Sequence, residues 1–362
     1  MNPSACDCRP GWSRREMLRW LGAAALAGCT RRRPPPDDDP DRALPPLERE
    51  LAIYNWSDYV APDTIANFER EFGVRVTYDV FESNEEMLAK LQAGARGYDL
   101  VVPAGNFVTP LVALGLAARP SRRYLPNAAN LSPLFRGLPF DPADAYTIPY
   151  QWGITGIAWR RDRLPERPAG WALLHDARLG GKLTQLDDMR DAIGAWLRYR
   201  GRSLNSTDPR HLAAARADAV RAKANLKAYI SAPVKAQLVA GDVWAAQLWN
   251  GDAAQARAEQ PAIEFTVPAE GTAIWLDSLV LTREALHPRA AHEFMNYILR
   301  PRVGADLSAA TGYGTPNRAA LELLENPIPY PTPDELSRLE YAADLGQATA
   351  LWDQIWTEIK AA

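Results

Sequence analysis

The sequence predicts an α/β protein with mostly parallel strands, and three observations support that fold class. Between residues 50 and 103, apolar strand patterns alternate with amphipathic helix patterns, in the order strand, helix, strand, helix, strand. The chain has 362 residues, which is enough for two domains of ordinary size. The apolar segments 148–157 and 274–281 are suited to carry the chain from one domain to the other and back. Two α/β lobes are therefore expected.

The first strand–helix–strand unit opens the folded part of the chain. Residues 50–56 are apolar and rich in β-forming side chains, which predicts a strand. A helix then begins at Pro62-Asp63, because apolar residues recur at helical spacing from there to a stop at Gly73. The alternating segment 74–80 predicts the second strand.

The next helix and strand complete this pattern. Ser83 followed by Glu86 is typical of a capping box at a helix start, and residues 98–103 predict the third strand. In parallel sheets, ligands bind beyond the carboxyl ends of the strands. The first strand delivers a candidate set of side chains to that edge, namely Trp56, Ser57, Asp58 and Tyr59.

The second half of the chain also places carboxylates just beyond a strand. Residues 183–186 predict a strand, and a helix that follows it would hold Asp188 and Asp191 three residues apart on one side. Acidic residues also suit the N-terminus of a helix, so the alternative is that both residues serve only in first-turn capping.

A further strand in this half ends in the same kinds of side chain. It is predicted at residues 243–248, after a polar helical region at 208–228. Trp249 ends the strand and Asp252 follows closely, which again combines an aromatic ring with a carboxylate.

The apolar strand 274–281 places an aromatic ring beside a carboxylate. Residues two apart in a strand point to the same side, so Trp275 and Asp277 share one face. A tryptophan face attracts cations, and a partly desolvated carboxylate needs a positive partner, which indicates a cation site. The alternative is that Trp275 packs in the core while Asp277 caps a turn.

A helix at 288–299 and two helical segments after residues 312–317 are expected next.

Composition narrows the class of function. Charged residues make up 23% of the chain and the net charge is −3, which argues against a general nucleic-acid binder. The four histidines are dispersed, without the spacing of metal ligands. Phosphate-binding, dinucleotide-binding and serine-hydrolase motifs are absent from the sequence. No cofactor and no metal are therefore expected, and the clusters of tryptophan and aspartate indicate a box for an elongated cation.

The beginning of the chain indicates export. Arg14-Arg15 precedes a short apolar run, as in a twin-arginine export signal. Residues 1–28 are then a signal peptide, and Cys29 is the lipidated first residue of a tether at 29–47. The alternative is an ordinary cleaved signal with a coincidental cysteine. Cys29 is the last of the three cysteines in the sequence, so the mature chain has no partner for a disulfide.

Seven motifs occur in the order found in one family of transport proteins. They are YNWSDY at 54–59, ESNE at 82–85, YDLVVP at 98–103, IPY at 148–150, WNG at 249–251, WLDS at 275–278 and GYGTPN at 312–317. With these motifs the chain resembles the periplasmic spermidine/putrescine-binding proteins of polyamine ABC importers, over roughly residues 50–355. Several of the motifs are specific to the polyamine-binding branch.

The resemblance implies a two-lobe periplasmic binding protein fold of type II, with the ligand in a cleft between the lobes. The first lobe is expected at residues 48–153 plus 276–317, and the second at 154–275 plus 318–362. We further expect a periplasmic monomer that performs no chemistry. It would hand its cargo to an ABC permease of the inner membrane and be held at the membrane by its lipid.

Carried over position by position, the resemblance implies a set of ligand-binding residues. These are Trp56, Ser57, Asp58, Tyr59, Asp188, Asp191, Trp249, Asp252, Trp275, Asp277 and Tyr313. Trp56, Tyr59, Trp249 and Trp275 would line the methylene chain and the ammonium groups. Asp188, Asp191 and Asp277 would pair with the amines, and Ser57, Asp58 and Tyr313 would lie nearby. Three positions depart from the family pattern, with Ala104 in place of a serine, Asn106 in place of a tyrosine and Ala342 in place of a glutamine. Ser57-Asp58 and Asp252 resemble putrescine-preferring members, whereas Trp275 and Asp188 resemble spermidine-preferring ones. Asp252 sets where a second ammonium must sit, so we expect putrescine to bind at least as tightly as spermidine.

Two other functions remain open on the sequence alone. One is a binding protein of the same fold that takes another cationic or polar small molecule, or that serves as a ligand sensor. The other is a secreted hydrolase or lyase in which Asp188 and Asp191 act as an acid/base pair.

Overall fold

The structure, a computed structural model, describes residues 41–231, 233–326 and 330–362. The signal peptide predicted at 1–28 and the lipidation site predicted at Cys29 lie outside the described residues.

The first part of the chain forms a parallel three-stranded unit, which confirms the predicted order of strands and helices. Strand β1 (Glu50–Trp56) pairs in parallel with β2 (Arg75–Phe81) on one side and with β3 (Leu100–Val101) on the other. Helix α2 (Thr64–Phe72) joins β1 to β2 and ends at Gly73. The φ of Gly73 is 64°, a left-handed conformation that glycine adopts at no steric cost.

Helix α3 (Asn84–Gln92) begins at the predicted Ser83, but only half of the expected capping box forms. The Ser83 hydroxyl accepts the N–H of Glu86 at 3.1 Å. The Glu86 carboxylate accepts the N–H of Glu82 at 3.1 Å instead of that of Ser83. The Glu86 side chain therefore accepts the backbone N–H of Glu82, one residue before the N–H that a complete capping box would use.

Two further elements follow that the sequence did not predict, namely α4 (Gly105–Ala113) and β4 (Ala117–Ala118). Strand β3 covers only the middle of the predicted strand 98–103. Pro103 has no N–H, so it cannot continue the hydrogen-bond ladder.

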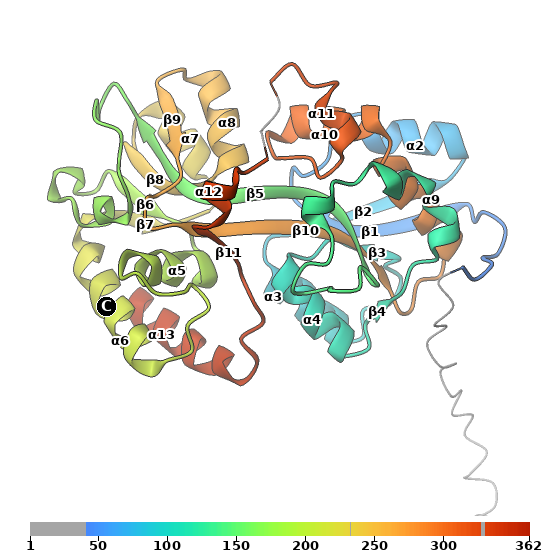
Figure 1. Ribbon diagram of the computed structural model, residues 1–362, viewed down its shortest axis with the longest axis horizontal. Helices are drawn as coiled ribbons and strands as arrows, with labels where there is room; N and C mark the ends of the chain where they lie inside the picture. The colour runs from blue at the N-terminus through green and yellow to red at the C-terminus, as the bar shows by residue number, and fades with distance from the viewer. Residues whose placement is uncertain (1–40, 232, 327–329) are drawn as a thin grey trace, which may run out of the picture. The chain divides into compact units, whose positions relative to one another are not determined.

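Two long antiparallel strands connect the two groups of elements. Strand β5 (Thr147–Arg160) and strand β10 (Thr272–Thr282) pair with each other, and β10 also pairs with β3. Beyond the contact with β10, β5 pairs with β8 (Ala245–Trp249) and β9 (Ile263–Thr266). Figure 1 shows β5 and β10 side by side, running from the elements around β1 to those around β8. The two predicted crossing segments are thus confirmed.

Eight of the described strands follow one another in a single mixed sheet, in the order β2-β1-β3-β10-β5-β8-β6-β7, where β6 is Leu183–Gln185 and β7 is Leu226–Tyr229. Its pairs are antiparallel where the crossing strands meet and parallel toward both edges, because β5 and β10 run in opposite directions between the groups. We call the group around β1–β3 the first lobe and the group around β6–β8 the second lobe. The lobe boundaries given above remain a prediction.

The second lobe is built on β6 (Leu183–Gln185), which pairs in parallel with β8 and with β7 (Leu226–Tyr229). Its helices are α5 (Met189–Tyr199), α6 (Pro209–Ala222), α7 (Val234–Ala240) and α8 (Asn250–Glu259). The prediction of a helical region up to residue 228 is wrong at its end. The helix stops at Ala222 and β7 follows, because this segment completes the edge of β6.

The last part of the chain returns to both lobes. Its elements are α9 (Pro288–Ile298), α10 (Pro301–Thr311), α11 (Arg318–Leu321), α12 (Pro333–Leu336), β11 (Leu339–Tyr341) and α13 (Thr349–Ala361). The helix expected at 288–299 is confirmed. The two C-terminal segments expected after residues 312–317 are instead three helices and a strand within the described part of the chain.

Each lobe has its own apolar core. In the first lobe Phe68, Phe294 and Leu279 belong to one buried cluster, whereas in the second lobe Trp171 and Trp196 belong to another. A smaller cluster around Trp152 packs on the crossing strands between them. The cleft described below lies beside these crossing strands.

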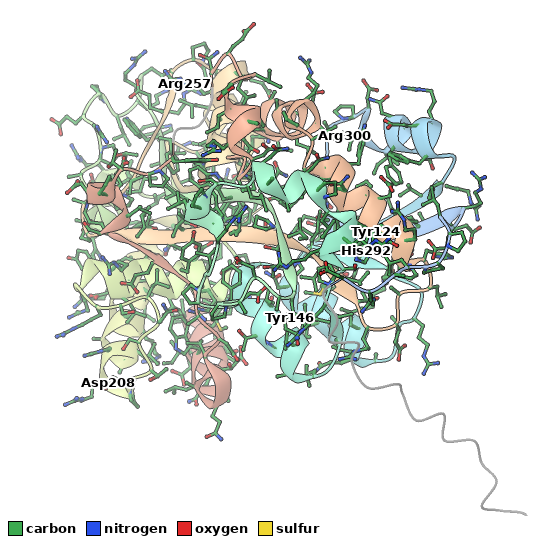
Figure 2. All side chains as sticks on the ribbon, turned by 45° about the vertical axis from the view of Figure 1, so that its right-hand side comes forward. Tyr124, Tyr146, Asp208, Arg257, His292 and Arg300 are labelled. Carbon is green, nitrogen blue, oxygen red and sulfur yellow. The ribbon has the colours of Figure 1, made fainter. Side chains whose placement is uncertain are left out.

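The described end of the predicted tether, residues 41–47, lies against the first lobe. Leu47 packs on the core of that lobe, and the N–H of Leu44 donates to the Tyr124 hydroxyl at 3.0 Å. Figure 2 shows Tyr124 next to His292, and their rings are 6.2 Å apart. This stretch is therefore held on the folded unit.

Candidate binding site

A cleft of about 250 Å³ lies between the two lobes, and all of the predicted binding residues line it. The first lobe contributes Trp56, Ser57, Asp58, Tyr59 and Tyr313, the second contributes Asp188, Asp191, Trp249 and Asp252, and strand β10 contributes Trp275 and Asp277. The three positions that depart from the family pattern, Ala104, Asn106 and Ala342, line it as well.

The ends of parallel strands explain how two of these sets reach the cleft. The chain leaves the carboxyl end of β1 at Trp56, and Asp58 then turns with a φ of 52°, in the left-handed region that aspartate tolerates better than most residues. Strand β8 likewise ends at Trp249. The sheet therefore delivers both tryptophans to the same cleft, as expected for the carboxyl ends of strands.

A chain of edge-to-face aromatic contacts forms one wall. Ring centroids are 5.5 Å apart for Tyr150 and Tyr59, 5.4 Å for Tyr59 and Tyr313, and 5.1 Å for Tyr313 and Trp275. Such near-perpendicular pairs are a favoured aromatic geometry. Glycine is required opposite this wall, because a Cβ on Gly153 would lie 2.3 Å from the Trp275 ring. The ring positions are thus set by packing.

Asp277 lines the cleft from strand β10, and it is almost fully buried. Burial raises its pKa from 3.8 to about 7, and the neighbouring Tyr59 hydroxyl opposes that rise. A carboxylate held in this way gains most from a positive partner, because it has lost hydration. Trp275 and Asp277, which the alternation of the strand predicts to lie on one side, both line the cleft.

Asp188 and Asp191 lie at the start of α5, where Asp188 caps the helix and both side chains line the cleft. The Asp188 side chain accepts the N–H of Asp191 at 2.8 Å, so the capping interpretation is confirmed for Asp188, whereas the Asp191 carboxylate makes no such bond among the described hydrogen bonds. The Asp191 carboxylate accepts the Thr155 hydroxyl at 2.8 Å and the Trp249 ring N–H at 3.0 Å. Burial raises the pKa of both aspartates, and the charge of Asp188 raises that of Asp191 further. Asp191 thereby orients Trp249.

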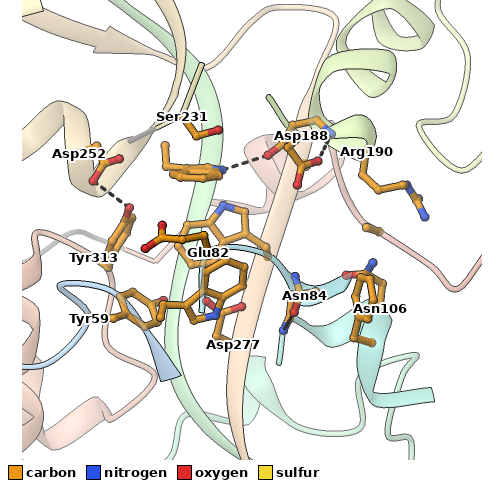
Figure 3. Close-up of a pocket in the computed structure, with 18 of the residues that line it drawn as sticks. Tyr59, Glu82, Asn84, Asn106, Asp188, Arg190, Ser231, Asp252, Asp277 and Tyr313 are labelled. Atoms are coloured by element: carbon orange, nitrogen blue, oxygen red, sulfur yellow. Dashed lines mark hydrogen bonds between the residues drawn. The ribbon is translucent and has the colours of Figure 1, made fainter. Parts of the chain in front are cut away.

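Asp252 and Tyr313 meet at another end of the cleft. The Tyr313 hydroxyl donates to Asp252 at 3.2 Å, and Figure 3 shows this contact away from Asp188 and Arg190. Burial raises the pKa of Asp252, while the Tyr313 hydrogen bond and the charge of Lys235 lower it.

Several cleft residues were missed when the sequence was interpreted. Glu82 accepts the Ser57 hydroxyl at 2.5 Å, and burial together with the charge of Asp188 raises the pKa of Glu85. Both glutamates follow the carboxyl end of β2, so the strand-end argument applied to β1 would have found them. Lys235 lies on α7, which the sequence patterns did not predict.

Negative charge dominates this cleft. The described lining residues include seven carboxylates and two cations, so the formal charge is 2 − 7 = −5 when all are ionised. The carboxylates are Asp58, Glu82, Glu85, Asp188, Asp191, Asp252 and Asp277, and the cations are Arg190 and Lys235. Among the described residues, no group of three or more His, Cys, Asp or Glu is arranged to hold a metal ion. Aromatic walls and unbalanced carboxylates suit an organic cation with an apolar body.

Comparison with known proteins identifies relatives that cover most of the chain. Residues 63–357 match the family described as bacterial extracellular solute-binding proteins. The chain is 34% identical to the spermidine/putrescine-binding periplasmic protein of Escherichia coli K12, over 86% of this chain and 91% of that one. It is 33% identical to the putrescine/cadaverine-binding protein of Pseudomonas aeruginosa, over 86% and 93%. A solved structure titled putative spermidine/putrescine ABC transporter from Listeria monocytogenes superposes with a TM-score of 0.82, at 32% identity, over 86% and 99%.

Proposed function

The chain belongs to the bacterial extracellular solute-binding protein family, and from this premise we propose that it captures a polyamine and delivers it to an ABC permease. The proposed cargo is putrescine, spermidine or both. The observation that carries the proposal is the buried carboxylate of Asp277 between aromatic rings, because a charge that has lost its hydration needs a cation.

The cleft offers aromatic rings to the apolar part of such a ligand and to its charges. Trp56, Tyr59, Trp249 and Trp275 can pack against the methylene groups, and their ring faces attract ammonium charges, at roughly 0.5–2 kcal/mol per cation–π contact. Each buried methylene adds about 0.8 kcal/mol, and each charge-assisted hydrogen bond roughly 1.5–3 kcal/mol.

These gains are reduced by the cost of ordering the ligand and closing the lobes. A net of about −8 kcal/mol, which corresponds to a roughly micromolar Kd, is reasonable. The proposed binding residues are the eleven that the sequence predicted. Asp188, Asp191 and Asp277 would pair with amines, and Asp252 would fix the position of a second ammonium.

Membership of an extracellular family places the protein outside the cytoplasm. We propose in addition that it is exported by a twin-arginine signal, is lipidated at Cys29 and acts as a periplasmic monomer without enzymatic activity. Within the described residues, no helix is long and apolar enough to cross a membrane.

Thermal shift and calorimetry on residues 41–362 test the proposal. Putrescine and spermidine should raise Tm and bind with roughly micromolar Kd, whereas glucose, glycine and alanine should have no effect. If neither polyamine binds, the proposed cargo is wrong.

A further inference from the structure

Lys235 places a positive charge inside the cleft, near the start of α7. Its ammonium donates to Oε1 of Gln255 at 2.6 Å. Gln255 is itself held, because its Nε2 donates to the carbonyl of Thr311 at 2.5 Å. The Lys235 side chain is therefore tied to α8, and it lines the cleft in a half-buried position.

Asp252 is the carboxylate on which this charge acts. It lies in the first turn of α8, one turn before Gln255, and accepts the Tyr313 hydroxyl at 3.2 Å. The positive charge of Lys235 and this hydrogen bond both lower the pKa of Asp252, against the effect of burial. The protein thus supplies Asp252 with a donor and a cation of its own.

Asp277 differs from Asp252 in having no cation of the described residues among the causes that shift its pKa. Burial raises this pKa and the Tyr59 hydroxyl lowers it, so the positive partner of the Asp277 carboxylate would be a ligand. The other cation of the cleft, Arg190, donates to the carbonyl of Ala343 at 2.7 Å and to Oδ1 of Asn205 at 2.6 Å. Arg190 therefore serves the other end of the cleft, where its charge lowers the pKa of Asp188 and of Asp191, while Lys235 acts on Asp252.

On the basis of the proposed polyamine-binding function, we propose that Lys235 is a specificity-determining residue. It is a built-in ammonium that limits the Asp252 end of the cleft to a single ligand amine, and so selects diamines over triamines. A triamine brings a third positive charge into the cleft, and at this end it meets the charge of Lys235 as well as that of Asp252. Repulsion between like charges in a partly desolvated site weakens binding roughly tenfold or more.

The test measures the Kd of putrescine and of spermidine by calorimetry for variants of residues 41–362. Lys235→Met removes the charge but keeps the length of the side chain, and Lys235→Arg keeps the charge. Lys227→Met is the matched control, since Lys227 is an exposed lysine of β7 in the same lobe that does not line the cleft. Circular dichroism and thermal melting establish that each variant folds.

Lys235→Met is expected to tighten spermidine roughly tenfold and putrescine by less than about threefold. Lys235→Arg and Lys227→Met are expected to keep the wild-type ratio of the two Kd values. If Lys235→Met does not fold, Lys235→Gln removes the charge and retains a donor for Gln255.

A ratio that stays unchanged when the charge of Lys235 is removed would overturn this inference while the proposed function stands. A wild type that binds neither amine would overturn the proposed function itself. A purely structural role for Lys235 would lower Tm and leave the ratio unchanged, so the two readouts separate these outcomes.

Discussion

Replacing Asp277 with Asn should change binding and stability in opposite directions. Burial raises the pKa of Asp277 from 3.8 to about 7 in the folded protein. A difference of about three pKa units corresponds to roughly 4 kcal/mol, which is the cost of holding the ionised carboxylate in the cleft. Asn has nearly the same shape and no charge. The variant should therefore be more stable than the wild type at pH 8, by up to roughly 4 kcal/mol, and should bind polyamine roughly 2–5 kcal/mol more weakly.

The sign of the pH dependence follows from the same raised pKa. The folded chain holds the Asp277 proton more tightly than the unfolded chain, so this group's contribution to stability is present below about pH 4. That contribution is lost as pH rises from about 4 to about 7 and then stays level. Binding of an ammonium group needs the ionised form. With a pKa of about 7, roughly one carboxylate in eleven is ionised at pH 6, so polyamine affinity should be about tenfold weaker at pH 6 than at pH 8.

Calorimetry at pH 6, 7 and 8, combined with chemical denaturation of the ligand-free protein, measures both effects. Asp63→Asn is a suitable control, because Asp63 is exposed, makes no side-chain capping bond and lies outside the cleft. It should leave affinity and its pH dependence unchanged. The reasoning is refuted if Asp277→Asn binds polyamines as tightly as the wild type, or if it is less stable than the wild type at pH 8.

Three further variants test other parts of the structure. Asp252→Ser should weaken putrescine more than spermidine by calorimetry, because Asp252 is the carboxylate that fixes the second ammonium of putrescine at this end of the cleft, and equal losses for both amines would contradict this. Gly153→Ala should destabilise the fold by roughly 1–3 kcal/mol in chemical denaturation and weaken polyamine binding, because the added Cβ would lie 2.3 Å from the Trp275 ring. Gly180→Ala serves as the control, since the nearest atom to its added Cβ is 3.6 Å away. Cys29→Ser should move the protein from the membrane to the soluble extracytoplasmic fraction, and identical soluble fractionation of wild type and variant would exclude lipidation.

The sequence by itself determined the elements that depend on local backbone geometry. Alternation and helical spacing predicted β1, α2 and β2, and the period of two in β10 placed Trp275 and Asp277 on one side. The carboxyl end of β1 likewise identified Trp56 as a cleft residue. Each of these follows from residues close together in the chain, whose relative directions the backbone of a strand or helix sets. The order of the seven motifs, which resembles that of a known family, then assigned residues far apart in the sequence to a single binding site.

Tertiary structure alone decided which of these side chains act on one another. Asp191 orients Trp249, 58 residues further on, and Lys235 adjusts the charge of Asp252 from a helix that the sequence patterns did not predict. The raised pKa of Asp277 likewise depends on tertiary packing, because burial raises it and Tyr59, more than 200 residues earlier in the chain, opposes that rise. Contacts of this kind arise only when separate elements pack, because hydration and Coulomb interactions depend on distance in space and not on separation along the chain.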